Sequence, residues 1–389
     1  MRRILGFIYQ SANNALYGAA WLYTRKFQQK GYAAEIFDLA RPDAYAELDR
    51  LLTRDEVAFC FAPQGVGSRL GNDEQSIWKK RRIPFVGLHG DNPCYNIFNH
   101  VSDTTYVANL YVYESFADIR RRYVSNDQIV DIVPFQTDPH AASPVRFRDR
   151  PIRLLYMKSG ASTGECEREL NALPHPLRDG VWQQLERACC DPNLSICDLV
   201  QEIFDRLNMD RVGNFDLFWG CAHWMDMYLR RKRAIDFVEW LKMQQGAVII
   251  GDGWDFIDKS KARAVFRPSV DIREIEEINT QTQFLCNTSP YGRDIIHERA
   301  VFGMLNESIV INDTNEWWDS NFGAIPALKR FDWGLPLDDQ LQPVLQMPVE
   351  QAEEESRTGR QPSVEQFTEQ DPVEKILTCV GRIDPECLP

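Results

Sequence analysis

The sequence lacks an apolar run long enough to cross a membrane. Its longest apolar runs, around residues 107–113 and 247–250, fall well short of the roughly 20 residues that a bilayer requires. The first nine residues contain two arginines but only a short apolar stretch and no small-residue cleavage site, which favours a β-strand over a signal peptide. We therefore expect a cytoplasmic protein that makes at most peripheral contact with a membrane.

The sequence also lacks an excess of positive charge. It has 44 lysines and arginines against 57 aspartates and glutamates, which gives a formal net charge of -13. Such a field repels phosphate backbones, so we expect no nucleic-acid partner. The one dense basic run is 230–233. Within an amphipathic helix such a run is usually a solvated face, and the alternative is contact with anionic lipid head groups.

Clustered metal ligands are missing as well. The ten cysteines show no repeated C-x-x-C spacing, and the six histidines are dispersed along the chain. Structural zinc sites need clustered cysteine or histidine, so we expect no metal site. Several cysteines lie in apolar runs, where a buried reduced thiol is the usual state.

What the sequence does contain is a repeated alternation of apolar strands and amphipathic helices. Its 389 residues, of which 44% are hydrophobic, suffice for two domains of ordinary size. Six strands are expected in the first part, at 3–9, 32–39, 57–62, 83–88, 105–112 and 129–134, with helices at 15–30 and 43–54. The alternation predicts a doubly wound, Rossmann-like α/β domain over residues 1–145.

A Pro- and Arg-bearing stretch at 138–151 interrupts this pattern and marks a domain boundary. A second Rossmann-like domain is expected over 151–335, with strands at 152–157, 247–250, 262–267, 284–287 and 309–312 and a helical segment at 165–245. Residues 336–389 are predicted to be an acidic, Pro-rich, solvated tail with a short terminal helix. The predicted fold class is therefore α/β, with two doubly wound domains that face a cleft.

Open α/β sheets bind ligands at the carboxyl ends of their strands, so the loops there are the candidate sites. The strongest is 287–303, which we interpret as a loop that opens into a helix at Pro290. The free amides of that first turn, at Tyr291 and Gly292, together with Arg293, suit a diphosphate. Glu298, further along, suits the two hydroxyls of a ribose. The alternative for Glu298 is a solvated helix glutamate.

Three further features each allow two interpretations. Lys158 follows a strand and is either a phosphate contact or an ordinary surface lysine. The stretch Gly251–Trp254 is either a ligand loop or a tight turn with Trp254 in the core. The adjacent Trp317 and Trp318 either stack on a base or a sugar ring or cover the edge of the core.

These motifs together resemble a known family. The basic helix 230–245, the turn 251–254, Asn287 and the stretch Glu298–Gly303 followed by Asp313 resemble the C-terminal domain of glycosyltransferases of the GT-B fold, within them the CgeB-like group of spore maturation proteins. The resemblance implies a nucleotide-sugar donor bound by the second domain, through Glu298, Asn287, Gly253, Trp254 and Asp313. The expected donor-binding residues also include Arg293, Gly292, Tyr291 and Lys158, from their positions in the loops described above. The resemblance further implies that Glu298 is the second glutamate of a paired motif. Pro290 occupies the place of the first, so the motif is incomplete.

The first domain resembles the family only at 86–93. There the resemblance implies the acceptor side, and His89 and Asp91 close a strand where a general base for an inverting transfer is expected. Arginine, lysine and helix amides can stabilise a leaving diphosphate, so neither a metal nor a cofactor is expected. The acceptor, whether a glycan, a lipid-linked group or a protein, is left open.

Two other functions fit the same residues. One is a nucleotide-sugar epimerase or hydrolase built on the same frame, which product analysis would separate from a transferase. The other is a non-catalytic protein that binds a nucleotide or a glycan, which the incomplete glutamate motif favours.

Overall fold

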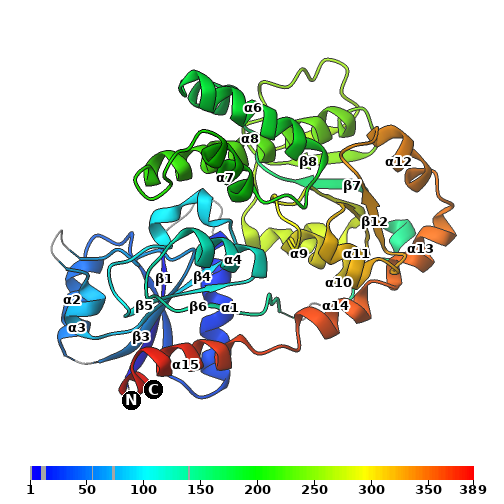
Figure 1. The fold of residues 1–389 in the computed structure, drawn as a ribbon. Helices are drawn as coiled ribbons and strands as arrows, with labels where there is room; N and C mark the ends of the chain where they lie inside the picture. Colours follow the sequence, from blue (N-terminus) through cyan, green and yellow to red (C-terminus); the bar gives the residue numbers. More distant parts are fainter. Residues whose placement is uncertain (1, 10–14, 55, 72–74, 139–140) are drawn as a thin grey trace. The chain divides into compact units, whose positions relative to one another are not determined.

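A computed structural model describes residues 2–9, 15–54, 56–71, 75–138 and 141–389 of the chain (Figure 1). The chain divides into two compact units. Unit 1 consists of Met1–Asp138 and Glu369–Pro389, and unit 2 of Pro139–Thr368. Within the predicted boundary stretch 138–151, residues 139–140 lie outside the described residues.

Unit 1 is built on a six-stranded sheet in the order β2-β1-β3-β4-β5-β6, in which every pair is parallel. The strands are β1 (Arg3–Ile8), β2 (Ala34–Asp38), β3 (Val57–Pro63), β4 (Phe85–His89), β5 (Val107–Tyr111) and β6 (Val130–Ile132), and the helices are α1 (Ala15–Gln29), α2 (Ala44–Thr53), α3 (Ile77–Arg81) and α4 (Glu114–Tyr123). Every residue of β3 is buried, because a central parallel strand is covered on both faces. The six predicted strands are confirmed to within a few residues.

Unit 2 contains a second parallel sheet, in the order β12-β11-β10-β7-β8-β9. Its strands are β7 (Ile152–Met157), β8 (Ala247–Ile250), β9 (Val265–Arg267), β10 (Thr282–Asn287), β11 (Ile309–Asp313) and β12 (Leu328–Phe331), and the helices that follow β9, β10 and β11 are α9 (Ile272–Thr280), α10 (Glu298–Leu305) and α11 (Glu316–Phe322). The sequence did not predict β12. This edge strand is short and carries two basic residues, so it has no apolar run.

Four helices lie between β7 and β8 and account for the predicted helical segment (Figure 1). They are α5 (Gly164–Asn171), α6 (His175–Cys190), α7 (Ile196–Arg206) and α8 (Phe215–Leu241). At 27 residues, α8 is roughly 40 Å long, far longer than the strand that follows it. Its last turns pack on the sheet through Phe237, Val238 and Leu241, and its earlier turns are buried within the helical layer.

The C-terminal region differs from the predicted solvated tail except at its end, where the predicted short terminal helix is present. It forms α12 (Leu337–Leu345), α13 (Val349–Arg357), α14 (Arg360–Phe367) and α15 (Pro372–Ile383). Leu341 and Ala352 belong to the core of unit 2, while Val373 and Ile376 belong to the core of unit 1. The acidic composition suggested a solvated tail, but many of the carboxylates on these helices pair with basic residues. Glu353, for example, pairs with Arg148 at 2.6 Å.

None of the described helices is both long enough and apolar enough to span a bilayer. Within the described ranges, no group of three or more histidine, cysteine, aspartate or glutamate side chains is placed to hold a metal ion. All ten cysteines are free thiols.

Candidate functional site

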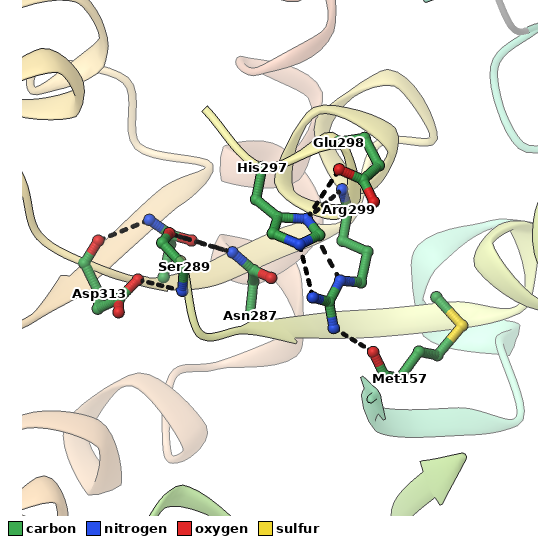
Figure 2. Close-up of polar contacts among 8 residues, drawn as sticks. Met157, Asn287, Ser289, His297, Glu298, Arg299 and Asp313 are labelled. Carbon is green, nitrogen blue, oxygen red and sulfur yellow. Dashed lines mark hydrogen bonds and ion pairs between the residues drawn. The ribbon is translucent and has the colours of Figure 1, made fainter. Parts of the chain in front are cut away.

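The candidate site of unit 2 lies at the carboxyl ends of its parallel strands, where the predicted loops converge. Lys158 follows β7, and the turn Gly251–Trp254 follows β8. The residues 288–297 connect β10 to α10, and Thr314 follows β11. Figure 2 shows the polar contacts around the ends of β7, β10 and β11.

Asn287 and Asp313 fix the beginning of the loop after β10 (Figure 2). Both side chains are buried. Asn287 Nδ2 donates to the side-chain oxygen Oδ1 of Asn312 at 2.6 Å. Asp313 accepts hydrogen bonds from the Ser289 amide at 2.9 Å and from the Trp333 indole at 3.1 Å. The Asn287 Oδ1 atom is buried and has no hydrogen-bond partner among the described residues, so it can accept a bond from a ligand or from water.

Lys158 lies among positively charged side chains. Its ammonium donates to the Thr288 hydroxyl at 3.2 Å, and Thr288 also hydrogen-bonds the Tyr156 hydroxyl at 2.7 Å. Burial, followed by the positive charges of Arg299 and Arg230, lowers the pKa of Lys158 from 10.5 to about 7. A lysine in this environment gains its proton back when an anion binds beside it. The geometry therefore favours the phosphate interpretation over an ordinary surface lysine.

Arg299 and His297 form the second part of this basic cluster (Figure 2). Arg299 donates to the Met157 carbonyl at the end of β7, and a guanidinium nitrogen lies 2.6 Å from His297 Nε2. His297 caps α10, with Nδ1 accepting from the Arg299 amide at 3.3 Å. Burial and the neighbouring cations hold the pKa of His297 well below its usual range, so its ring is neutral near pH 7.

Helix α10 begins at Glu298, so the predicted helix start at Pro290 is wrong. The segment Pro290–Arg293 is a loop in which Gly292 has a φ of 155°, a value that α-helical backbone does not adopt. The first-turn amides of the helix consequently belong to residues near Glu298. The carboxylate of Glu298 is 53% exposed and lies 3.2 Å from His297 Nδ1, which leaves it accessible to a ligand.

Two of the predicted loop residues have structural contacts. Tyr291 is buried, and its hydroxyl donates to the Asp191 carbonyl at 2.6 Å. Arg293 has an exposed side chain, while its backbone carbonyl accepts from the Trp317 amide at 3.0 Å. Trp317 in turn stacks on Phe322 with centroids 5.5 Å apart. The tryptophan pair thus covers the edge of the core, as the second interpretation of the sequence proposed.

The basic run 230–233 is not a solvated face, and that interpretation is corrected. Arg233 is only 4% exposed, and its guanidinium lies 4.9 Å from the centroid of the Tyr291 ring. Arg230 is half-buried and pairs with the buried carboxylate of Asp226 at 2.6 Å. Because α8 is covered by the helical layer and by the loop after β10, residues on several of its faces are buried.

Trp254 fills the core beneath the lysine. It is 2% exposed, and its indole donates to the Lys158 carbonyl at 2.8 Å. A Cβ atom on Gly160 would lie 2.4 Å from the Trp254 ring, and Gly253 adopts a φ of 82°. The turn therefore positions the Lys158 loop through backbone placement, and the tight-turn interpretation describes it better than a direct ligand contact by the ring.

In unit 1 the structure corrects the role predicted for His89. The side chain has no exposed surface. Its Nε2 lies 2.9 Å from Asn109 Oδ1, and its ring stacks on His100 with centroids 3.9 Å apart. Burial lowers the pKa of His89 to about 3. A ring enclosed in this way cannot contact an acceptor hydroxyl, so His89 is part of the core beneath the loop.

Asp91 is half-buried in the loop after β4. The side-chain amide nitrogen of Gln64 donates to the Asp91 carboxylate at 2.8 Å. The side-chain amide nitrogen of Asn99 donates to the backbone carbonyl of Gln64 at 3.0 Å. Gln64 has a φ of 54°, a left-handed conformation that is uncommon outside glycine and often marks functional loops. These contacts join the loops after β3 and β4 and orient Asp91.

Sequence reasoning missed Arg299, Thr288 and His297 as members of the site. Arg299 and His297 flank Glu298 in the sequence, so the helix start, once located, would have indicated them. Arg230 and Arg233 were noticed but assigned to solvent. No local signal links them to Lys158, about 70 residues earlier, because only the packing of α8 against the sheet brings them together.

No protein-family model and no curated protein matches the sequence. Solved structures do match it. Anabaena HepE in complex with UDP and glucose has a TM-score of 0.51 at 11% identity, with 99% of both chains covered. Sucrose-phosphate synthase from Thermosynechococcus elongatus has a TM-score of 0.55 at 10% identity, again with 99% of both chains covered. An alpha-glucosyltransferase in complex with UDP-glucose and DNA containing an abasic site has a TM-score of 0.53 at 9% identity, covering 97% of this chain and 99% of the other.

At these identities the likeness shows the fold. The chain has the two-domain α/β architecture of GT-B glycosyltransferases, with two six-stranded parallel sheets surrounded by helices. The predicted α/β class with two doubly wound domains is thereby confirmed.

Proposed function

We propose that this protein is a glycosyltransferase that takes a sugar from a nucleotide-diphosphate donor bound by unit 2. The observation that carries the proposal is the concentration of positive charge around the end of β7. Four cationic side chains, Lys158, Arg230, Arg233 and Arg299, share the site with the carboxylates of Asp226 and Asp313. The basic side chains outnumber these two buried carboxylates, and a bound diphosphate would offset the excess positive charge as Lys158 regains its proton.

The comparisons support the same donor class. Structures of this fold are described in complex with UDP and with UDP-glucose. Within the fold, similarity to the CgeB-like group rests on the motifs of the second domain alone, and we propose it on that basis. Acceptor binding is assigned to unit 1, and no metal or cofactor is required by the proposal.

The proposed chemistry follows from the charges. As the bond between the sugar and the diphosphate breaks, negative charge develops on the leaving phosphate, and Lys158 and Arg299 stabilise it. The exposed Glu298 accepts hydrogen bonds from the two ribose hydroxyls. Asp91 is the proposed base that takes the proton of the acceptor hydroxyl. Pro290 replaces the first glutamate of the paired motif, so we assign no retaining mechanism.

The donor site is tested by thermal-shift and calorimetric titration of UDP, dTDP, GDP, ADP and CMP. A ligand that binds only the folded protein raises its melting temperature. We expect one nucleotide to stabilise the wild-type protein, with a weaker shift for Glu298→Ala and none for Lys158→Met. Lys261→Met is the matched control, because Lys261 is exposed in the same unit. If no nucleotide shifts the wild-type protein, the donor-site proposal is wrong.

A second candidate function is non-catalytic binding of a nucleotide or a glycan, favoured by Pro290 at the place of the first glutamate. Nucleotide binding without turnover of any nucleotide sugar would support it. A nucleotide-sugar hydrolase or epimerase on the same frame would instead release a free sugar or an isomerised donor, which chromatography of the products detects.

A further inference from the structure

Unit 1 exposes its aromatic side chains unevenly. Among its described residues, six aromatic side chains are between 40% and 56% exposed: Tyr9, Tyr17, Trp21, Tyr45, Tyr95 and Phe98. Single exposed apolar residues are normal on a soluble protein, whereas a gathered set of large ones marks a binding surface. The six side chains mark a binding surface only if they share one region of unit 1.

The chain direction places all six toward one edge of the sheet, with α1 on one face of the sheet and α2 on the other. Tyr9 directly follows β1, and Tyr17 and Trp21 lie in the first two turns of α1, the next element. Tyr45 lies in the first turn of α2, which follows β2. Tyr95 and Phe98 belong to the two short 3-10 turns after β4. Because every strand of this sheet is parallel, each of these positions is at its carboxyl edge.

At the opposite edge, the aromatic side chains that the structure describes are less exposed. Tyr32 and Tyr106 precede β2 and β5 and are half-buried. Tyr32 packs edge-on against Phe27, with centroids 6.1 Å apart. The Tyr106 hydroxyl hydrogen-bonds Arg82 at 3.0 Å. The exposed aromatic residues among the described part of unit 1 are therefore concentrated at the carboxyl edge.

The surroundings of the six rings favour a carbohydrate. The face of an aromatic ring carries partial negative charge and attracts the polarised C–H groups of a sugar ring. Sugar hydroxyls also need hydrogen-bonding partners. Asp91 lies on the loop after β4 and Gln64 on the loop after β3, and the Gln64 side chain donates a hydrogen bond to the Asp91 carboxylate. Arg69 lies 5.2 Å from the Phe98 centroid and adds a donor. The net charge of -13 disfavours a polyanionic ligand.

The extent of the surface favours several sugar rings. The elements that carry the six rings follow β2, β1 and β4, and β3 lies between β1 and β4. Three strand spacings amount to about 14 Å, which is longer than a single hexose. We propose that the carboxyl edge of unit 1 binds a neutral oligosaccharide as the acceptor, with Tyr95 and Phe98 stacking on sugar rings near Asp91. This inference rests on the proposed glycosyltransferase function and names the class of its acceptor.

The test is binding of neutral oligosaccharides to the full-length protein, with maltohexaose, cellohexaose and chitohexaose and their monosaccharides as probes, followed by a wider array of neutral glycans. We expect at least one oligosaccharide to bind more tightly than its monosaccharide. Phe98→Ala and Tyr95→Ala should each weaken that binding by about 3- to 10-fold, while Phe98→Trp preserves it. Leu388→Ala is the matched control, since Leu388 is 47% exposed in the same unit and adjoins Cys387, which contacts Arg82 at the opposite edge.

Three outcomes would overturn the inference. The first is that no neutral glycan binds in the presence of the stabilising nucleotide. The second is that binding occurs but is unaffected by Phe98→Ala and Tyr95→Ala. The third is that phosphatidylcholine or phosphatidylglycerol vesicles, in place of glycans, bind in a manner that depends on Phe98. Nucleotide titration of the same variants separates the two proposals, because the donor site lies in unit 2. Nucleotide binding without glycan binding overturns only the acceptor assignment, whereas glycan binding without nucleotide binding overturns only the donor site.

Discussion

Replacing Lys158 by methionine should stabilise the ligand-free protein while removing its affinity for nucleotide. Methionine has nearly the shape of lysine but no charge. The ammonium of Lys158 is disfavoured in the fold by burial and by Arg299 and Arg230, so the substitution removes an electrostatic cost. It also removes the hydrogen bond to Thr288, which is 3.2 Å long.

The size of the effect follows from the pKa. The pKa of Lys158 falls from 10.5 to about 7 on folding, and each pKa unit corresponds to about 1.36 kcal/mol. At pH 7 the lysine therefore costs about 4 kcal/mol relative to a neutral side chain of the same shape. Loss of the Thr288 bond offsets about 1 kcal/mol. The net expected gain for Lys158→Met is on the order of 3 kcal/mol in the free energy of unfolding.

The sign of the pH dependence is fixed by proton counting. Between pH 7 and pH 10.5 the unfolded chain holds more protons at this residue than the folded chain, so wild-type stability rises with pH across that window. The advantage of Lys158→Met should therefore be largest below pH 7 and shrink as the pH approaches 10. Urea unfolding of both proteins at pH 6.5 and pH 9.5 measures it, with Lys261→Met as the control. A variant less stable than the wild type at pH 6.5 would refute the reasoning.

Three further predictions follow from the same contacts. Nucleotide affinity should fall as the pH rises above about 7, because free Lys158 then loses its proton; calorimetry at pH 6.5 and pH 8.5 should show this for the wild type and for Lys261→Met, whereas Lys158→Met should bind nucleotide at neither pH. Gly160→Ala should lower the free energy of unfolding by about 2 kcal/mol or more, since its Cβ would lie 2.4 Å from Trp254; Gly164→Ala, which has room, should be neutral in the same melting experiment. Asp91→Asn should reduce kcat for transfer by at least about 100-fold with nucleotide affinity unchanged; full turnover would exclude Asp91 as the base.

Much of the fold was predictable because each buried strand corresponds to a short run of apolar residues in the sequence. The limits of β7 and β8 match the apolar runs 152–157 and 247–250, since a buried parallel strand is a continuous apolar run. Knowing where the strands end was enough to locate the candidate loops, because ligands of such sheets bind at the carboxyl ends. Lys158 and Glu298 were identified on this basis.

The helix start and the C-terminal helices were less predictable. The sequence pattern placed the start of α10 at Pro290, but Gly292 adopts a backbone conformation that excludes a helix there, and His297 caps the helix instead. The acidic residues of 349–383 suggested solvent exposure. The apolar positions among them are few, and they become core residues only when both sheets are present to receive them.

The sequence by itself determined the parallel strands of both sheets apart from β12, and the position of the loops that carry Lys158, Asp91 and Glu298. The tertiary structure alone decided which charges meet. It buried Arg233 and brought Arg230 to Lys158 through the packing of α8, and it enclosed His89 under its own loop. The physical reason is that strand formation depends on neighbouring residues, whereas the pKa and accessibility of a side chain depend on groups that are distant in the sequence and close only in the folded chain.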